Sequence, residues 1–310
     1  MRLPMKLYRL VLVLLIYVHS ACSVSKVSRQ PISSGHYCEP GIVYPDNAQF
    51  APLSTLPSDT SLTNHWSAHT LLMANAVGII PLLHQLTYLP VSADLQTQFL
   101  RTSLRQQIQS RLLLASVEIA SLAAELDCEG ERADQLATYL DQQDQKRIRN
   151  LTLLSVILGA ITTVATALIP ADNTDKIVGI GGGLLSAGLG SGAALSSKKT
   201  VLFQHERNLL TDIWTADEQS LLYAPFIWYV LNEKEFSNTR RHSIRANIKR
   251  RWQQYGVVGM TPEQQQLLFG RGGNYQADAL HTRANMLNQL QSSIRSINQD
   301  LQSLLLALTR

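Results

Sequence analysis

The most regular hydrophobic pattern in the chain lies at its C-terminal end. Apolar residues recur there at alternating spacings of three and four, and they are Leu287, Leu290, Ile294, Ile297, Leu301, Leu304 and Leu308. This spacing is the a/d repeat of a coiled coil, so it predicts a long helix that packs along a second helix. The flanking positions are mostly Gln, Ser and Asn, so charge does not identify the partner. We expect a second copy of the chain or another protein.

A second long amphipathic helix is predicted in the first half of the chain, with Ser92 as its N-cap. Its apolar stripe also follows spacings of three and four, and it consists of Leu100, Leu104, Ile108, Leu112, Ala115, Ile119, Leu122 and Leu126. Gly130 predicts a break in this helix. The stripe then continues to Leu140, and a polar stretch follows that ends in the basic residues 146–149.

Residues 61–93 contain no Asp, Glu, Lys or Arg, and their apolar residues predict a helix that Pro81 kinks. Such a segment could lie in a membrane. The polar side chains of Asn75, His84 and Gln85 instead favour a helix in the protein core.

The pattern changes abruptly at residue 151. Residues 151–169 and 177–195 are two runs of nineteen residues without a charge, separated by the polar turn 170–176. Each run would form about 28 Å of helix, which is the length needed to cross a bilayer. The sequence therefore predicts a membrane-spanning helical hairpin. A hairpin buried inside protein, within the chain or in an oligomer, is the alternative.

The second run of this hairpin contains seven glycines. In water each would cost a helix about 1 kcal/mol relative to Ala, whereas in lipid the helix persists because its backbone has no other hydrogen-bond partner. Small residues at a spacing of four let two helices approach closely. The small faces predicted to pack in the hairpin consist of Gly159, Thr163, Ala167, Gly179, Gly183, Gly188 and Gly192.

The remaining segments also indicate helices. Residues 202–236 are predicted to be helical and carry an aromatic cluster, and Thr261 to Gln264 read as a capping box before a short helix that Gly270 ends. No stretch shows the period-two alternation of a β-strand. The predicted fold is all-α, with long helices in coiled-coil packing and a glycine-rich apolar hairpin.

Composition narrows the class of protein. Charged residues make up 16% of the chain and apolar residues 45%, which excludes disorder over most of the length. Lys and Arg number 27 and Asp and Glu 23. Three of the cations, Arg2, Lys6 and Arg9, lie within residues 1–22, and without them the balance is 24 against 23. A nucleic-acid partner is therefore not expected.

Residues 1–22 follow the order of an export signal, with Arg2 to Arg9 as a basic region and Leu10 to Val18 as a nine-residue apolar core. Small residues then precede Cys22, and the segment resembles the leader of bacterial lipoproteins. That resemblance implies that residues 1–21 are removed and that Cys22 is acylated as the mature N-terminus. His19 stands where that family has Leu, so cleavage after Ser20 and an uncleaved anchor remain the alternatives.

The chain has three cysteines, Cys22, Cys38 and Cys128. If Cys22 carries lipid, the other two can form a disulfide in an oxidising compartment. Two reduced, buried thiols are the alternative interpretation.

A basic run with apolar residues on one face extends from Arg240 to Trp252. It predicts a helix at a lipid surface, with Arg241, Arg245 and Lys249 at the head groups. The alternative is a solvated helix whose apolar side joins the core.

The sequence shows no catalytic, metal or cofactor motif. His65 and His69 are four residues apart, but no third ligand is near them, so we interpret them as structural. No arrangement of a nucleophile and a base is present, which argues against an envelope hydrolase.

Together these patterns divide the chain into a signal peptide (1–21), a tether (22–60), an N-terminal helical region (61–150), the hairpin (151–197) and a C-terminal helical region (198–310). By the positive-inside rule, the basic residues that flank the hairpin would place the two helical regions in the cytoplasm. The export signal in residues 1–22 instead places them outside the cytoplasm, and we give this signal more weight. We expect a protein of the bacterial envelope that contacts the lipid bilayer, has a scaffold or assembly role, and binds its own copies or another envelope protein through the C-terminal helix. A pore-forming protein that acts through the hairpin is the alternative.

Overall fold

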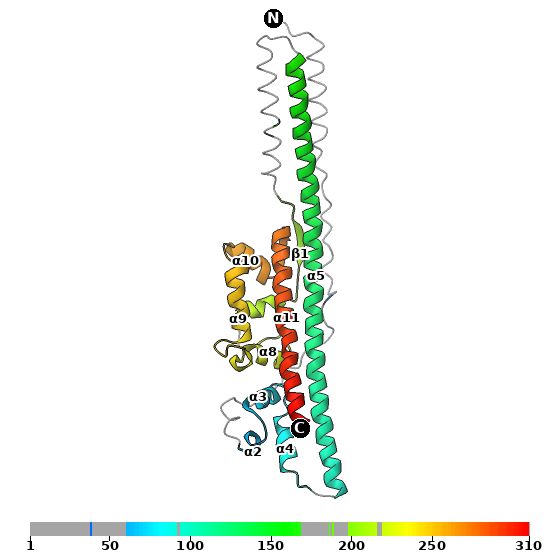
Figure 1. Ribbon diagram of the computed structural model, residues 1–310, viewed down its shortest axis with the longest axis vertical. Coiled ribbons are helices and arrows are strands. Elements are labelled where there is room, and N and C mark those ends of the chain that lie inside the picture. The colour runs from blue at the N-terminus through cyan, green and yellow to red at the C-terminus, as the bar shows by residue number, and fades with distance from the viewer. Residues whose placement is uncertain are drawn as a thin grey trace. The chain divides into compact units, whose positions relative to one another are not determined.

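The computed structural model describes Cys38 and residues 60–91, 94–168, 186, 188, 198–215 and 219–309, with the side chains of 165–168 excepted. The elements in chain order are α2 (Thr60–Thr63), α3 (Ala68–Ala76), α4 (Ile80–Tyr88), α5 (Leu95–Leu168), β1 (Val201–Gln204), α7 (Leu209–Thr215), α8 (Pro225–Asn232), η1 (Lys234–Phe236), α9 (Ile244–Arg251), η2 (Trp252–Gly256), α10 (Pro262–Phe269), β2 (Gly272–Tyr275) and α11 (Ala277–Leu308) (Figure 1). The predicted all-α class is confirmed, with one small β-ribbon added.

Helix α5 has 74 residues and runs from the N-terminal helical region into the first apolar run without interruption. Asp94 caps its start, because its carboxylate accepts from the amide and the hydroxyl of Thr97 at 3.1 and 3.2 Å. The predicted cap, Ser92, lies outside the described residues. The predicted break at Gly130 is wrong. Gly130 is helical, and a Cβ there would lie 3.0 Å from Oδ1 of Asn288, so the glycine lets α11 approach closely.

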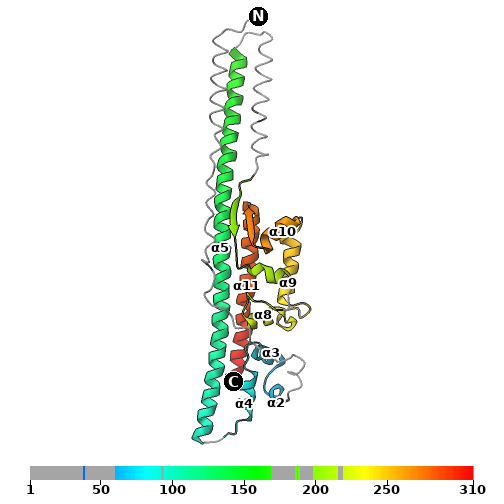
Figure 2. The same cartoon turned by 180° about the vertical axis from the view of Figure 1, so that it is seen from behind.

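Helix α11 packs antiparallel to α5. Its residues Leu287 and Asn288 face Gly130, whereas Gln291 reaches the carbonyl of Ala123, seven residues earlier on α5. The predicted seam is buried from Leu287 to Leu304. Figures 1 and 2 show the two helices side by side from opposite directions. The partner of the seam is therefore a helix of the same chain, and any second protein must contact another face.

The charge-free stretch before α5 forms two helices and not one kinked helix. Helices α3 and α4 are bent by 120° at a turn where Gly78 has a φ of +73°. Pro81 lies in the first turn of α4, where its missing amide hydrogen removes no helical hydrogen bond. Leu71, Ile79 and Leu83 are buried, so the interpretation of this segment as protein core is confirmed.

The helical stretch predicted over residues 202–236 is wrong at its start and in its middle, because the described residues 219–224 between α7 and α8 are not helical. Val201–Gln204 forms β1, which pairs antiparallel with β2 and places Gln204 opposite Gly272. Gly272 has a φ of +86°, and a Cβ there would lie 2.3 Å from the carbonyl oxygen of Phe203. Only glycine fits this position, so it fixes where the ribbon forms.

The segment from α7 to α10 covers one side of α11. The predicted capping box is confirmed, because the hydroxyl of Thr261 accepts from the amide of Gln264 and the Gln264 side chain accepts from the amide of Thr261. Gly270 is the C-cap of α10, as predicted. Trp252, at the start of η2, is 1% exposed and anchors this segment to the core.

Candidate membrane hairpin and its polar base

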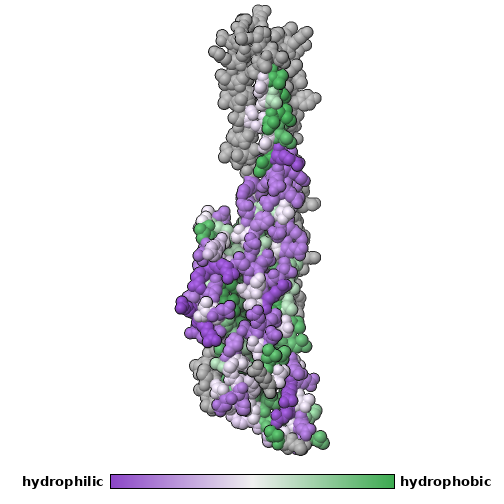
Figure 3. Space-filling view, in the orientation of Figure 1, coloured by the Kyte–Doolittle hydropathy of each residue, from purple (hydrophilic) through white to green (hydrophobic). Residues whose placement is uncertain are grey.

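The first arm of the predicted hairpin is the last part of α5, and its apolar side chains are not covered by protein. Those that are about half exposed or more are Leu153, Leu154, Val156, Ile157, Ile161 and Val164. By length and composition α5 is apolar enough to cross a membrane, and none of its apolar window is buried. The bent pair of α3 and α4 would make a second candidate only if it were one span. Figure 3 shows hydrophobic surface along the upper part of α5, directly above hydrophilic surface.

The second arm contacts the first through a reciprocal pair of serines. The hydroxyl of Ser155 donates to the carbonyl of Ser186 at 2.9 Å, and the hydroxyl of Ser186 donates to the carbonyl of Ser155 at 3.0 Å. Gly159 lies one turn further along α5, where a Cβ would be 3.5 Å from the Ser186 hydroxyl. At this point Ser186 therefore meets α5 at small residues, and each hydroxyl of the pair has an acceptor.

The other hydroxyls of the described first arm bond to their own helix. Thr152 donates to the carbonyl of Ile148 at 2.9 Å, Thr162 to that of Leu158 at 3.0 Å, and Thr163 to that of Gly159 at 2.8 Å. Such bonds satisfy a hydroxyl that has no water near it. In this part of the chain the polar side chains therefore require no partner outside the hairpin.

The structure bears differently on each residue that is predicted to pack the two arms together. Gly159 faces the second arm, as predicted. Thr163 is exposed and donates to its own helix, and a Cβ at Gly188 would meet nothing within 4 Å, so packing of the arms at these two positions stays a prediction. The Ala167 side chain and the glycines at 179, 183 and 192 lie outside the described residues. A spacing of four between small residues does not single out Ser155 and Ser186, and the signal for them is a small polar residue inside a charge-free run.

Charged and polar groups close the base of the hairpin. The ammonium group of Lys198 forms an ion pair with Asp278 at the start of α11. Lys199 donates from its backbone amide to Asp144 at 3.2 Å and from its Nζ to Gln143 at 3.0 Å. The chain that returns from the second arm is thus joined to both α5 and α11.

His281 adds a second link between α5 and α11 beside this base. Its Nδ1 lies 3.0 Å from Asp134 and its Nε2 lies 2.9 Å from Asp141. The hydrogen bond to Asp141, with that to Asp134, raises the pKa of His281 above its ordinary value, against a smaller opposing effect of desolvation. When the imidazole is protonated, both nitrogens donate and the base is held more firmly.

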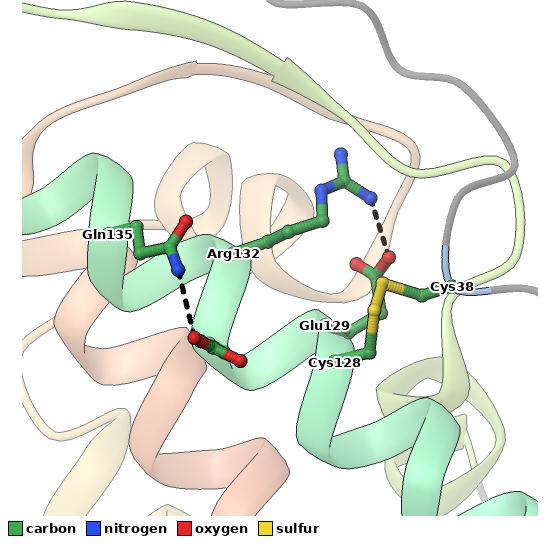
Figure 4. Close-up of a disulfide and its surroundings, with 6 residues drawn as sticks. Cys38, Cys128, Glu129, Arg132 and Gln135 are labelled. Carbon is green, nitrogen blue, oxygen red and sulfur yellow. Dashed lines mark hydrogen bonds and ion pairs between the residues drawn. A yellow bond between two sulfur atoms is a disulfide. The ribbon is translucent and has the colours of Figure 1, made fainter.

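The predicted disulfide is present. Cys38 and Cys128 are joined, with 5.7 Å between their Cα atoms and a sequence separation of 90 (Figure 4). Cys128 lies on α5 next to Glu129, whose carboxylate pairs with Arg132 at 2.6 Å. From Cys128 to Asp144 there are about sixteen residues of α5, or about 24 Å. The disulfide therefore attaches the N-terminal tether near the hairpin base.

Only residues 244–251 of the basic run form α9, whose apolar side joins the core through Ile248 and Trp252, and Arg241 precedes the helix. The guanidinium of Arg245 lies 5.1 Å from the ring centroid of Trp228, and the Nζ of Lys249 lies 5.3 Å from that of Trp214. Arg241 is exposed. Contact of Arg241, Arg245 and Lys249 with lipid head groups stays a prediction, and two of the three already bind aromatic rings.

A polar groove of about 510 Å³ lies between α9 and α11, with Arg250 and Ser293 among its lining residues. Ser293 is about fifteen residues beyond Asp278 along α11, which is about 22 Å. The groove and the basic helix are thus set back from the hairpin base.

The histidine pair has structural contacts. The Nε2 of His69 lies 3.0 Å from Asp300, and its ring meets the edge of Phe236. His65 precedes α3, so the two histidines do not share a helix face. Among the residues that the structure describes, no group of three His, Cys, Asp or Glu side chains is placed to hold a metal ion.

No protein-family model, curated protein or solved structure matches this chain. The proposed function therefore rests on the geometry of the hairpin, its polar base and the disulfide.

Proposed function

We propose that the chain is an exported envelope protein, anchored in a membrane by its hairpin, with a scaffold or assembly role. The observation that carries this proposal is the uncovered apolar end of α5, which continues directly from a helix packed as protein core. Water would not tolerate such a surface, because large exposed apolar patches mark contact with a protein or a lipid. The length of the charge-free run matches a bilayer.

The hydrogen bonding of the described arm favours an anchor over a pore. A pore needs polar groups that face an aqueous channel, whereas the serine pair joins the two arms and the threonines bond to their own helix. An anchor needs an exterior without unsatisfied polar groups. The large exposed side chains of this arm are apolar, and the exposed Thr152 and Thr163 donate to carbonyls of their own helix.

The position of the disulfide supports an anchor at Cys22 in the same membrane. Sixteen residues separate Cys22 from Cys38, and an extended chain of that length reaches about 54 Å. That reach exceeds the distance of about 24 Å from Cys128 to the hairpin base. A disulfide also supports an oxidising, extracytoplasmic compartment.

The contacts of the basic residues beside the hairpin weaken the argument that the helical regions lie in the cytoplasm. Five cations directly flank the hairpin, and they are Lys146, Arg147, Arg149, Lys198 and Lys199. Of these, Lys198 pairs with Asp278, and Lys199 bonds to Gln143 and lies beside Asp144. These two cations serve the base of the hairpin, so their presence has a structural explanation apart from membrane topology. The export signal in residues 1–22 is then the reason for placing the helical regions outside the cytoplasm.

Two exposed positions on the apolar arm test the proposal. In Ile157→Lys with Ile161→Lys, each lysine at the bilayer centre costs insertion roughly 3 kcal/mol. The matched control is Leu113→Lys with Val117→Lys, also exposed, also four residues apart and on the same helix. In water both double variants add charge to an exposed surface. The test uses chains that lack residues 1–21 and carry Cys22→Ser, so that no acyl chain holds them. We expect alkaline extraction of the vesicles to release only the first variant, and equal retention of both would contradict the hairpin anchor.

The same protein in dye-loaded vesicles separates an anchor from a pore. We expect no release of dye beyond that of dye-loaded vesicles without protein, whereas release that requires residues 151–195 would favour the pore-forming alternative.

The lipid anchor is tested by Cys22→Ser. The native N-terminal peptide should carry the mass of acyl chains that the variant lacks, and an unmodified native peptide would reject acylation.

A further inference from the structure

The turn between α4 and α5 exposes four large apolar side chains at the end of α5 opposite to the hairpin. We call them the apolar tip. They are Tyr88, Val91, Leu95 and Phe99, with exposed fractions of 72, 101, 82 and 77%. Single exposed apolar residues are common on protein surfaces, but four in twelve residues form a patch, and such patches mark contact surfaces. Figure 3 shows hydrophobic surface at the lower end of the molecule, where α5 begins.

The backbone of the apolar tip is held in place by polar contacts behind it. The guanidinium of Arg101 donates to the carbonyls of Leu89 and Pro90 at 3.2 and 3.1 Å. Asp94 caps the first turn of α5 through the amide of Thr97. The fold thus presents these apolar side chains outward and does not fold them back onto α3 or α4.

The apolar tip cannot reach the membrane that holds the hairpin. Leu95 and Asp144 are about 49 residues apart along α5, which is about 74 Å. The spanning arm and this segment are one continuous helix, so a spanning arm with the usual tilt of about 20° holds α5 close to the membrane normal. The apolar tip is then separated from the hairpin base by more than twice the thickness of a hydrocarbon core.

The charges around the apolar tip fit an anionic lipid surface. Residues 61–93 carry no Asp, Glu, Lys or Arg, and the charged residues that follow, up to position 111, are Asp94, Arg101, Arg105 and Arg111. Arg105 is exposed, and the carboxylate of Asp94 is engaged in its cap. An apolar tip backed by cations is the composition of segments that bury apolar side chains below anionic head groups.

We propose that the apolar tip inserts into a second lipid surface with anionic head groups, so that the chain bridges two membranes. This inference rests on the proposed hairpin anchor, because the hairpin fixes the tip away from the first membrane. A partner helix from a second copy would need a groove or a continuous seam that includes the tip. A groove of about 630 Å³ lies between α4 and α5, with Pro81 and Leu114 among its lining residues, but none of the four tip residues lines it, which favours lipid over a second copy. The seam of this chain is already occupied between α5 and α11.

A two-vesicle capture experiment tests the bridge. The full mature chain is reconstituted into dense vesicles of neutral phosphatidylcholine, and fluorescent vesicles of phosphatidylcholine and phosphatidylglycerol are added without protein. The variant is Leu95→Ser with Phe99→Ser, and the matched control is Leu113→Ser with Val117→Ser, which removes exposed apolar residues at the same spacing from the middle of α5. Circular dichroism and disulfide retention confirm that both variants fold.

We expect the wild-type chain and the control to sediment the fluorescent vesicles, and the tip variant to capture at least about tenfold less, because two large apolar side chains no longer insert. Equal capture by the two variants would overturn the tip proposal while leaving the hairpin intact. A second arm uses fluorescent vesicles of the same lipids that also carry the protein. Capture of these vesicles alone would assign the tip to a second copy and overturn the lipid assignment. Failure of the chain to sediment with the first vesicles would instead reject the hairpin anchor.

Discussion

Removal of the disulfide should lower the stability of the helical body by up to about 4.6 kcal/mol. The bond between Cys38 and Cys128 closes a loop with a sequence separation of 90. The chain-entropy relation for a loop of this length gives about 15.5 cal/mol/K, or about 4.6 kcal/mol at room temperature. This value is a ceiling, because a denatured chain that keeps residual structure loses less entropy on closure.

The assay is urea-induced unfolding of the full chain in detergent micelles, followed by tryptophan fluorescence. The four tryptophans, Trp66, Trp214, Trp228 and Trp252, all lie outside the hairpin, so the signal reports the helical body. The oxidised chain is compared with the reduced chain and with Cys38→Ser plus Cys128→Ser. The reduced chain and the double variant should unfold at the same lower urea concentration, and reductant should not change the double variant.

Two results would refute this reasoning. If reduction changed the free energy of unfolding by less than about 1 kcal/mol, the loop would not be the constraint that the entropy relation assumes. If a thiol reagent labelled Cys128 quantitatively in the folded, unreduced chain, the bond itself would be absent.

His281→Gln should remove a pH-dependent contribution to stability. The pKa of His281 is raised in the folded state, so its stabilisation is full below the ordinary value of about 6.5 and is lost as pH rises through the raised value. The partly exposed ion pairs are worth at most about 1 kcal/mol, so the wild type should exceed the variant by that amount near pH 5 and by little near pH 9; a constant difference would reject this role. Ile294→Ala should cost about 2–5 kcal/mol in urea unfolding because Ile294 is 0% exposed, whereas Leu305→Ala, at 47% exposed on the same helix, should cost under about 0.5 kcal/mol. Equal losses would contradict the packing of α11 on α5.

The sequence predicted those parts of the fold that a local pattern specifies. The a/d repeat from Leu287 onward requires a partner helix, and the capping box at Thr261 is complete within four residues. The break expected at Gly130 was wrong because the helix penalty of glycine is only about 1 kcal/mol. Close approach of Asn288 from α11, more than 150 positions away, explains the glycine instead.

The parts that the sequence did not reveal depend on residues far apart in the chain. Strand β1 has four residues, too few to show alternation, and its place is set by Gly272 from the opposite strand. The ion pair of Lys198 with Asp278 and the contact of His281 with Asp141 join segments at least 80 residues apart. In the hairpin, the glycine spacing does not predict the contact of Ser155. A hydroxyl inside an apolar run needs an acceptor, so the residue itself was the signal.

The most direct test of the membrane hairpin is the depth of Ile157 in a bilayer. An environment-sensitive fluorophore is attached to Ile157→Cys and, in a separate chain, to Leu113→Cys, with Cys22 replaced by Ser so that only the new thiol reacts. The protein is placed in lipid nanodiscs that contain nitroxide-labelled acyl chains. The hairpin account predicts strong quenching at Ile157 and none at Leu113. A fluorophore at Ile157 that is as unquenched and as water-exposed as the one at Leu113 would contradict it.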